Sequence, residues 1–170
     1  SLGKSTTNEV IAGSINHVKS LDPTPDSWAS NPNNVVGVYT VKMEAGAIWT
    51  LAKTSKDANR TIFYYKGENI EIEGQSVNSD HFIETLASEA ITIKNGGKDS
   101  YFLILEGKPI NEPVVQHGPF VMNTEEEIRD AMREYGKTQF GGWPWAKREV
   151  VHAKGKGRFA QHSDGQVEMK

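Results

Sequence analysis

The feature that most constrains the fold is a series of short apolar segments, spaced about ten residues apart and separated by glycine and asparagine. In residues 36–44 (VGVYTVKME), Tyr39, Val41 and Met43 alternate with their neighbours, which is the period of a half-buried strand. Further strands are predicted at residues 48–52, 61–65, 70–73, 90–93 and 101–105. Short strands at this spacing indicate an antiparallel sandwich or barrel.

The residues between these segments predict how the strands are joined. Residues 66–69 (KGEN) and 95–97 (NGG) have the composition of hairpin turns, so we expect the strands on either side of each to pair, and residues 73–76 (EGQS) are predicted to form a further turn. Residues 101–105 (YFLIL) are continuously apolar. That run predicts a strand buried on both faces.

The pattern changes after Pro119, where a helix is predicted. Thr124 and Glu127 fit a capping box, in which each side chain bonds the backbone amide of the other residue. Four apolar residues recur at helical spacing and form one stripe: Ile128, Ala131, Met132 and Tyr135. Gly136 is the expected C-cap, so the helix should have about three turns.

Composition excludes several classes of protein. The chain has no cysteine, which excludes disulfides and thiolate metal sites, and we expect a cytoplasmic protein. The formal net charge is −3, and no apolar run is long enough for a membrane span. Five basic residues lie near the C-terminus: Lys147, Arg148, Lys154, Lys156 and Arg158. A solvated segment explains them better than a nucleic-acid site, because no stacking pattern of aromatic residues accompanies them.

Residues 105–128 (LEGKPINEPVVQHGPFVMNTEEEI) resemble the signature of the C-terminal domain of pirins. Residues 10–20, 43–53 and 59–74 resemble the start and first strands of the same domain, and residues 157–170 resemble the ending of longer bacterial pirins. The most specific part of the signature contains Gly118, Pro119, Phe120, Asn123 and Thr124, for which a structural role is expected.

The resemblance implies a mainly β fold, a cupin-type (RmlC-like jelly roll) antiparallel β-barrel with a C-terminal α-helix and an extended tail. We expect the barrel at residues 9–122, the helix at residues 123–136 packed on the same domain, and an aromatic and basic tail at residues 137–170. Pirins are bicupins whose metal, usually iron, is bound in the N-terminal barrel by three histidines and a glutamate. Members are described as quercetin dioxygenases in bacteria and as nuclear cofactors of transcription factors in animals.

Because only the C-terminal half is matched, no cofactor and no catalytic or metal-binding residue is expected in this chain. The expected partner is an N-terminal cupin or a second copy of the chain. A metal site of this type needs two histidines two residues apart on one strand, since such residues share a face. The five histidines lack that spacing: His17, His81, His117, His152 and His162. The barrel should therefore have an apolar interior, with these residues as candidate lining: Tyr39, Trp49, Tyr64 and Phe102.

Two further features have both a structural and a functional interpretation. His117 precedes Gly118 and is expected to be a turn residue whose ring bonds nearby backbone, although an imidazole can also act as an acid or base. An aromatic cluster of Phe140, Trp143 and Trp145 follows the helix. It should pack on the barrel or on the stripe of the helix, or else, together with Ile128 and Tyr135, meet a partner.

The favoured functional hypothesis is a non-catalytic module that supports a metal-bearing N-terminal cupin or acts in protein interaction. One alternative is a part of an iron-dependent dioxygenase of the quercetinase type. Another is a barrel that binds a small molecule.

Overall fold

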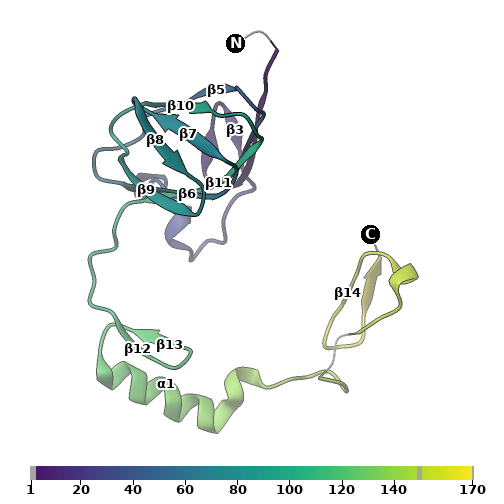
Figure 1. The fold of residues 1–170 in the computed structure, drawn as a ribbon. Coiled ribbons are helices and arrows are strands. Elements are labelled where there is room, and N and C mark those ends of the chain that lie inside the picture. Colours follow the sequence, from purple (N-terminus) through teal and green to yellow (C-terminus); the bar gives the residue numbers. More distant parts are fainter. Residues whose placement is uncertain (1–2, 149–150, 170) are drawn as a thin grey trace. The chain divides into compact units, whose positions relative to one another are not determined.

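The computed structural model describes residues 3–148 and 151–169. The chain forms two compact units, residues 1–110 and residues 111–170 (Figure 1). The first unit is built from β-strands, and the second contains the helix and two small hairpins. Within the described residues, no helix is long and apolar enough to cross a membrane.

Two antiparallel sheets make up the first unit. The five-stranded sheet has the order β1 (Thr6–Ala12), β4 (Gly37–Met43), β11 (Ser100–Gly107), β6 (Asn59–Lys66) and β9 (His81–Leu86). The four-stranded sheet has the order β5 (Ile48–Leu51), β10 (Ile91–Asn95), β7 (Asn69–Ile72) and β8 (Gln75–Asn78). A short hairpin, β2 (Ser14–Ile15) and β3 (Val18–Lys19), and two 3-10 turns, η1 (Trp28–Ser30) and η2 (Pro32–Asn34), complete it. The strands predicted from the sequence are therefore present, whereas β1, β2, β3, β8 and β9 were not predicted.

One hydrophobic core joins the inward faces of both sheets. Tyr39, Val41 and Met43 of β4 are 3%, 2% and 0% exposed, so the predicted alternation is confirmed. From the other sheet, Ile70 and Ile72 of β7 enter the same core. Burial of about 25 cal/mol for each Å² of apolar surface makes this core the main source of stability of the unit.

Both predicted hairpins are wrong, whereas the predicted turn at residues 73–76 is confirmed. Residues 73–76 do join the paired strands β7 and β8, and Glu73 and Gly74 have the positive φ angles, 46° and 82°, that such a turn needs. Residues 66–69 and 95–97 instead carry the chain from one sheet to the other. At the second of these corners, the buried Asn95 amide donates to the carbonyl oxygens of Met43, Glu44 and Lys98, and those bonds hold the crossing.

The prediction that β11 is buried on both faces is also wrong. Phe102 and Ile104 point into the core and are fully buried, whereas Leu105 is 38% exposed. The strand therefore has one face in the core and one apolar face directed outward. Sequence periodicity cannot distinguish an apolar face that is covered from one that is not.

The second unit starts with a hairpin and a helix. Strands β12 (Val115–His117) and β13 (Phe120–Met122) pair, and α1 (Glu125–Thr138) follows. The predicted capping box is present: Glu127 N donates to Thr124 Oγ1 at 3.2 Å, and Thr124 N donates to Glu127 Oε2 at 2.8 Å. The predicted C-cap is wrong, because Gly136 lies inside α1 and Gln139 caps it in the left-handed conformation. The helix is consequently longer than expected.

The boundary between the units differs from the expected barrel end at residue 122. The hairpin β12–β13 contacts α1 and belongs to the second unit. Beyond the helix, η3 (Gln139–Gly141) and η4 (Lys154–Lys156) precede a hairpin of β14 (Phe159–Gln161) and β15 (Val167–Met169). The region expected as an extended tail thus contains a paired hairpin.

Candidate functional site

The interior of the first unit is filled by apolar side chains. The inward positions of β5 carry Trp49 and Leu51, and those of β10 carry Ile91 and Ile93, all 8% exposed or less. All five histidines of the sequence are exposed. Within the described residues, no three His, Asp or Glu side chains come together as a metal site would require. The residues inside this unit therefore do not fit an iron centre of the histidine-rich type.

A buried ion pair occupies one end of the core. Arg60 of β6 and Glu106 of β11 lie opposite each other, with their side chains 0% and 2% exposed. Arg60 Nε donates to Glu106 Oε2 at 2.9 Å, and the rest of the guanidinium donates to the carbonyl oxygens of Ala52, Ala87 and Glu89. Thr54 Oγ1 also donates to Glu106 Oε2, at 3.2 Å. The ion pair thus links β6 and β11 to three carbonyl groups of neighbouring loops, and these bonds close this end of the core.

Next to this ion pair lies a cavity of about 520 Å³, and Tyr39, Thr54 and Glu106 are among the residues that line it. Tyr39 Oη donates to the carbonyl oxygen of Ser14 at 3.1 Å. Burial, with the nearby Glu106 carboxylate, raises the pKa of Tyr39 to about 12, so its hydroxyl stays protonated at neutral pH. A side chain at Gly37 would collide with the Tyr39 ring, which explains the glycine there.

The sequence analysis missed Arg60 and Glu106. Their signal was present in the alternation of the strands, because Arg60 shares a face with Ile62 and Tyr64, and Glu106 shares one with Ile104. A charged residue at an inward position predicts a buried partner.

The four candidate lining residues all lie in the core. Tyr39, Trp49, Tyr64 and Phe102 are 3%, 8%, 0% and 0% exposed. Tyr64 and Phe102 stack on each other with ring centroids 5.0 Å apart. Of the four, Tyr39 lines the cavity, and the other three fill the core beside their neighbours.

The signature residues hold together the junction between hairpin and helix. Gly118 has a φ of 56° at the turn, Pro119 follows it, and His117 pairs with Phe120 across the hairpin. Asn123 Nδ2 donates to Glu112 Oε2 at 2.8 Å, and Thr124 caps α1. His117 is exposed, and among the described residues its ring makes no hydrogen bond, so the expected bond to backbone is not formed.

The candidate interface residues separate into two groups. Ile128 is buried within the second unit, whereas Tyr135 and Phe140 are 43% and 57% exposed. Both rings form edge contacts with Phe120, with centroids 6.2 Å apart. Phe140 therefore packs on the stripe of α1, and the two tryptophans do not join it. The prediction that Phe140, Trp143 and Trp145 form a single aromatic cluster is therefore wrong.

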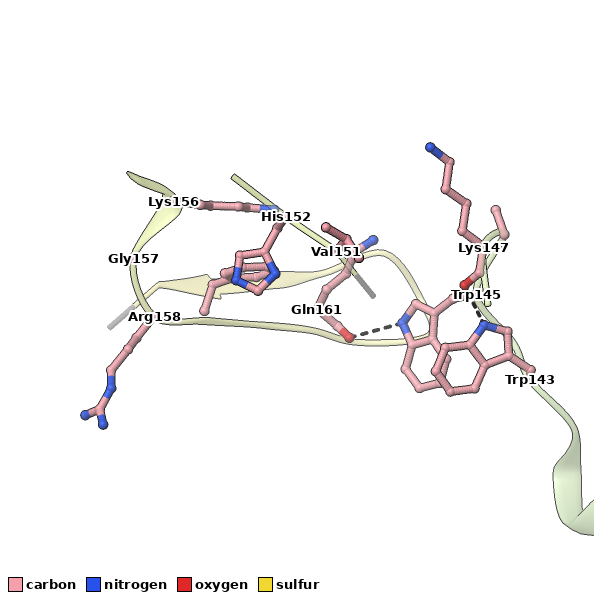
Figure 2. A pocket seen from close by; sticks show the side chains of 11 residues that line it. Trp143, Trp145, Lys147, Val151, His152, Lys156, Gly157, Arg158 and Gln161 are labelled. Carbon is pink, nitrogen blue, oxygen red and sulfur yellow. Dashed lines mark hydrogen bonds between the residues drawn. The ribbon is translucent and has the colours of Figure 1, made fainter. Parts of the chain in front are cut away.

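Trp143 and Trp145 form a second group, shown in Figure 2. Their ring centroids are 4.7 Å apart, and their indole nitrogens donate to the carbonyl oxygens of Lys147 and Gln161. They border an open pocket of about 690 Å³ whose other walls include His152. In Figure 2 the side chains of Lys147 and Arg158 point away from the ring systems, so the basic groups do not converge on one point.

Comparison with known families identifies the fold. The family model of the pirin C-terminal cupin domain matches residues 38–141, more than half of the chain. The chain belongs to this family. The match includes the four-stranded sheet, every strand of the five-stranded sheet except β1, the hairpin β12–β13 and α1.

Individual relatives agree with this assignment. A Vibrio cholerae protein named "Putative quercetin 2,3-dioxygenase" is 34% identical over 131 residues, which are 77% of this chain and 44% of that protein. Human pirin is 37% identical over 123 residues, 72% of this chain and 33% of human pirin. The crystal structure of a quercetin 2,3-dioxygenase from Acinetobacter baumannii has a TM-score of 0.66 at 25% identity, over 81% of this chain and 44% of that one. This pirin-type chain therefore spans less than half the length of these relatives.

Proposed function

We propose that this chain is a non-catalytic cupin module that supports a second, metal-bearing cupin. The observation that carries the proposal is the composition of the core, where a cupin would hold its metal. Apolar side chains from both sheets fill that space. The buried carboxylate of Glu106 is bound by Arg60 and Thr54, so its negative charge is already balanced by the guanidinium of Arg60.

The relatives supply the context for a supporting role. Two of them are named as quercetin 2,3-dioxygenases, and the chain matches less than half of each. An activity of the whole protein therefore needs residues from the unmatched part, whereas this chain contributes a rigid β unit and a helix. A module of this kind needs no metal for its own fold, since its core is complete without one.

The first test is the iron content of the chain. The purified protein is incubated with ferrous iron, desalted and subjected to elemental analysis, and we expect well below one iron per chain. Oxygen uptake with quercetin should equal that of a blank with the same iron and no protein. Near-stoichiometric iron that survives desalting would show that the exposed histidines converge in solution, and the dioxygenase hypothesis would then replace this one.

A further inference from the structure

The cavity of about 520 Å³ beside the ion pair has no part in the proposed supporting role. Segments within residues 11–36 provide most of its wall, and Tyr39, Thr54 and Glu106 provide the rest. All of these residues belong to the first unit. Cavities of roughly 300–1,000 Å³ are the usual size of sites for small organic molecules, so this one is large enough to hold a ligand.

The cavity reaches a buried carboxylate that has hydrogen-bonding capacity left. The Glu106 side chain is 2% exposed. Arg60 Nε and Thr54 Oγ1 both donate to its Oε2 atom, at 2.9 Å and 3.2 Å. Among the described residues, no hydrogen bond ends on the other oxygen, Oε1. Because a buried oxygen without a donor is unfavourable, a donor placed in the cavity would stabilise this end of the core.

The Tyr39 hydroxyl is a second acceptor at the same end of the cavity. Its single proton is donated to the carbonyl oxygen of Ser14 at 3.1 Å, so the lone pairs of Oη remain available. Burial and the nearby Glu106 carboxylate raise the pKa of Tyr39 to about 12, which keeps this hydroxyl neutral. Gly13 preserves the space beside it, because a Cβ there would lie 3.3 Å from Oη and collide with the Val36 carbonyl oxygen. The inner end of the cavity therefore presents acceptors to a ligand.

The rest of the wall is mainly apolar and has balanced charges. Six residues contribute apolar side chains: Ile11, Leu21, Pro23, Pro32, Val35 and Val36. Lys19 and Asp22 also line the cavity, but Lys19 Nζ lies 2.6 Å from Asp22 Oδ1, so their charges are paired. An anion would face the Glu106 carboxylate without a free cation to bind it. A neutral molecule meets no such opposition.

One residue of this wall has a strained backbone. Val35 has φ 53° and ψ 39°, the left-handed region that a β-branched residue rarely adopts. Its amide donates to the carbonyl oxygen of Pro32 at 3.2 Å, which holds the turn in place. Strain of this kind persists where surrounding contacts require it, and it is concentrated at ligand-binding sites. It is therefore consistent with a wall whose shape matters.

We propose that this cavity binds a small neutral alcohol, whose hydroxyl group donates to Glu106 and whose apolar body contacts the wall. An amide fits less well, because its carbonyl oxygen would face the same acceptors. An ammonium group fits less well too, since Arg60 already balances the carboxylate and a second buried positive charge would be unpaired. The ligand site adds to the supporting role and does not depend on it.

The first part of the test compares three probes that share one ring. Benzyl alcohol carries the donor, benzyl methyl ether lacks it, and benzoate replaces it with an anion. Each is titrated into the ¹⁵N-labelled full chain, and amide chemical shifts give the dissociation constant. We expect benzyl alcohol to bind saturably in the millimolar range, with shifts in residues 11–14 and 35–39. The ether and benzoate should bind at least about fivefold more weakly.

The second part locates the site with two cavity variants and their matched controls. Tyr39→Phe removes an acceptor, and Ala29→Leu adds volume to the wall. Tyr64→Phe removes a buried hydroxyl that is bonded to Ser100 outside the cavity, and Ala90→Leu makes the same enlargement at an exposed position outside it. We expect each cavity variant to bind benzyl alcohol about fivefold more weakly, and both controls to bind like the wild type.

Thermal melts establish which variants fold, and either cavity variant alone is sufficient to locate the site. Absence of saturable binding by benzyl alcohol would overturn the inference. Equal binding of the three probes, or tighter binding of benzoate, would overturn the assignment to a neutral donor. Binding that no folded cavity variant weakens would place the site elsewhere and overturn the inference as well. None of these results bears on the supporting function, which the iron content tests separately.

Discussion

At the scale of single residues, the ion pair between Arg60 and Glu106 is the feature of the first unit that should be most sensitive to substitution. Both side chains are inaccessible, and the guanidinium satisfies three loop carbonyls besides the carboxylate. Charges removed from water cost several kcal/mol each, and the pair is tolerated because the guanidinium donates both to the carboxylate and to three carbonyl oxygens. Removal of one partner should therefore be far more damaging than removal of an exposed charge.

Glu106→Gln leaves the buried guanidinium without a counter-charge, and we expect the free energy of unfolding to fall by about 3 kcal/mol. The matched control is Glu71→Gln, which breaks the exposed ion pair with Lys94 and should cost about 0.5 kcal/mol or less. Urea denaturation followed by tryptophan fluorescence measures both. Equal losses in the two variants would contradict a special role for the buried pair.

At the scale of elements, the start of α1 depends on one carboxylate. Glu127 Oε2 accepts from the backbone nitrogens of Asn123 and Thr124, at 3.1 Å and 2.8 Å. Its neighbour Glu126 contributes only a negative charge near the positive end of the helix. The two glutamates are thus a natural pair for separating capping from helix-dipole effects.

Glu127→Ala should destabilise the helix by about 1 kcal/mol, because it removes one half of the capping box. Glu126→Ala should cost only about 0.3 kcal/mol, the lower end of a charge–dipole contribution. Circular dichroism at 222 nm during thermal unfolding compares the variants. If Glu126→Ala were as damaging as Glu127→Ala, charge rather than capping would explain the helix start.

At the scale of the whole molecule, the two units differ in how much they bury. The first unit has a continuous core drawn from both sheets, whereas Ile128 and Ala131 are the only buried hydrophobic residues among the described residues of the second. Local stability follows buried apolar contacts, so the units should open independently and with different free energies.

We expect amide hydrogens of β4, β6 and β11 to exchange only through global unfolding of the first unit, and those of α1 to exchange at least tenfold faster. Hydrogen–deuterium exchange with mass spectrometry resolves both sets of peptides in the intact chain. The edge strand β9 is an internal control, since it should exchange faster than β6 in the same sheet. Protection of α1 equal to that of β11 would show that the units unfold together.

The sequence by itself determined six strands of the two sheets, which face of β4 enters the core, and where the helix begins, because periodicity and capping are local. It did not determine which strands pair. Residues 66–69 and 95–97 have the composition of hairpin turns but cross between sheets, since the side-chain contacts of Tyr64, Asn95 and Ser100 decide the direction of the chain.

The tertiary structure also decided what the apolar and charged positions do. It brought Arg60 and Glu106 together across 46 residues of sequence and separated Phe140 from the two tryptophans. It showed that the outward side of β11 is uncovered, which periodicity cannot reveal, because an apolar side chain has the same sequence signal whether its own chain or a partner buries it. Burial depends on contacts between segments that are distant in sequence, and only the folded structure specifies those contacts.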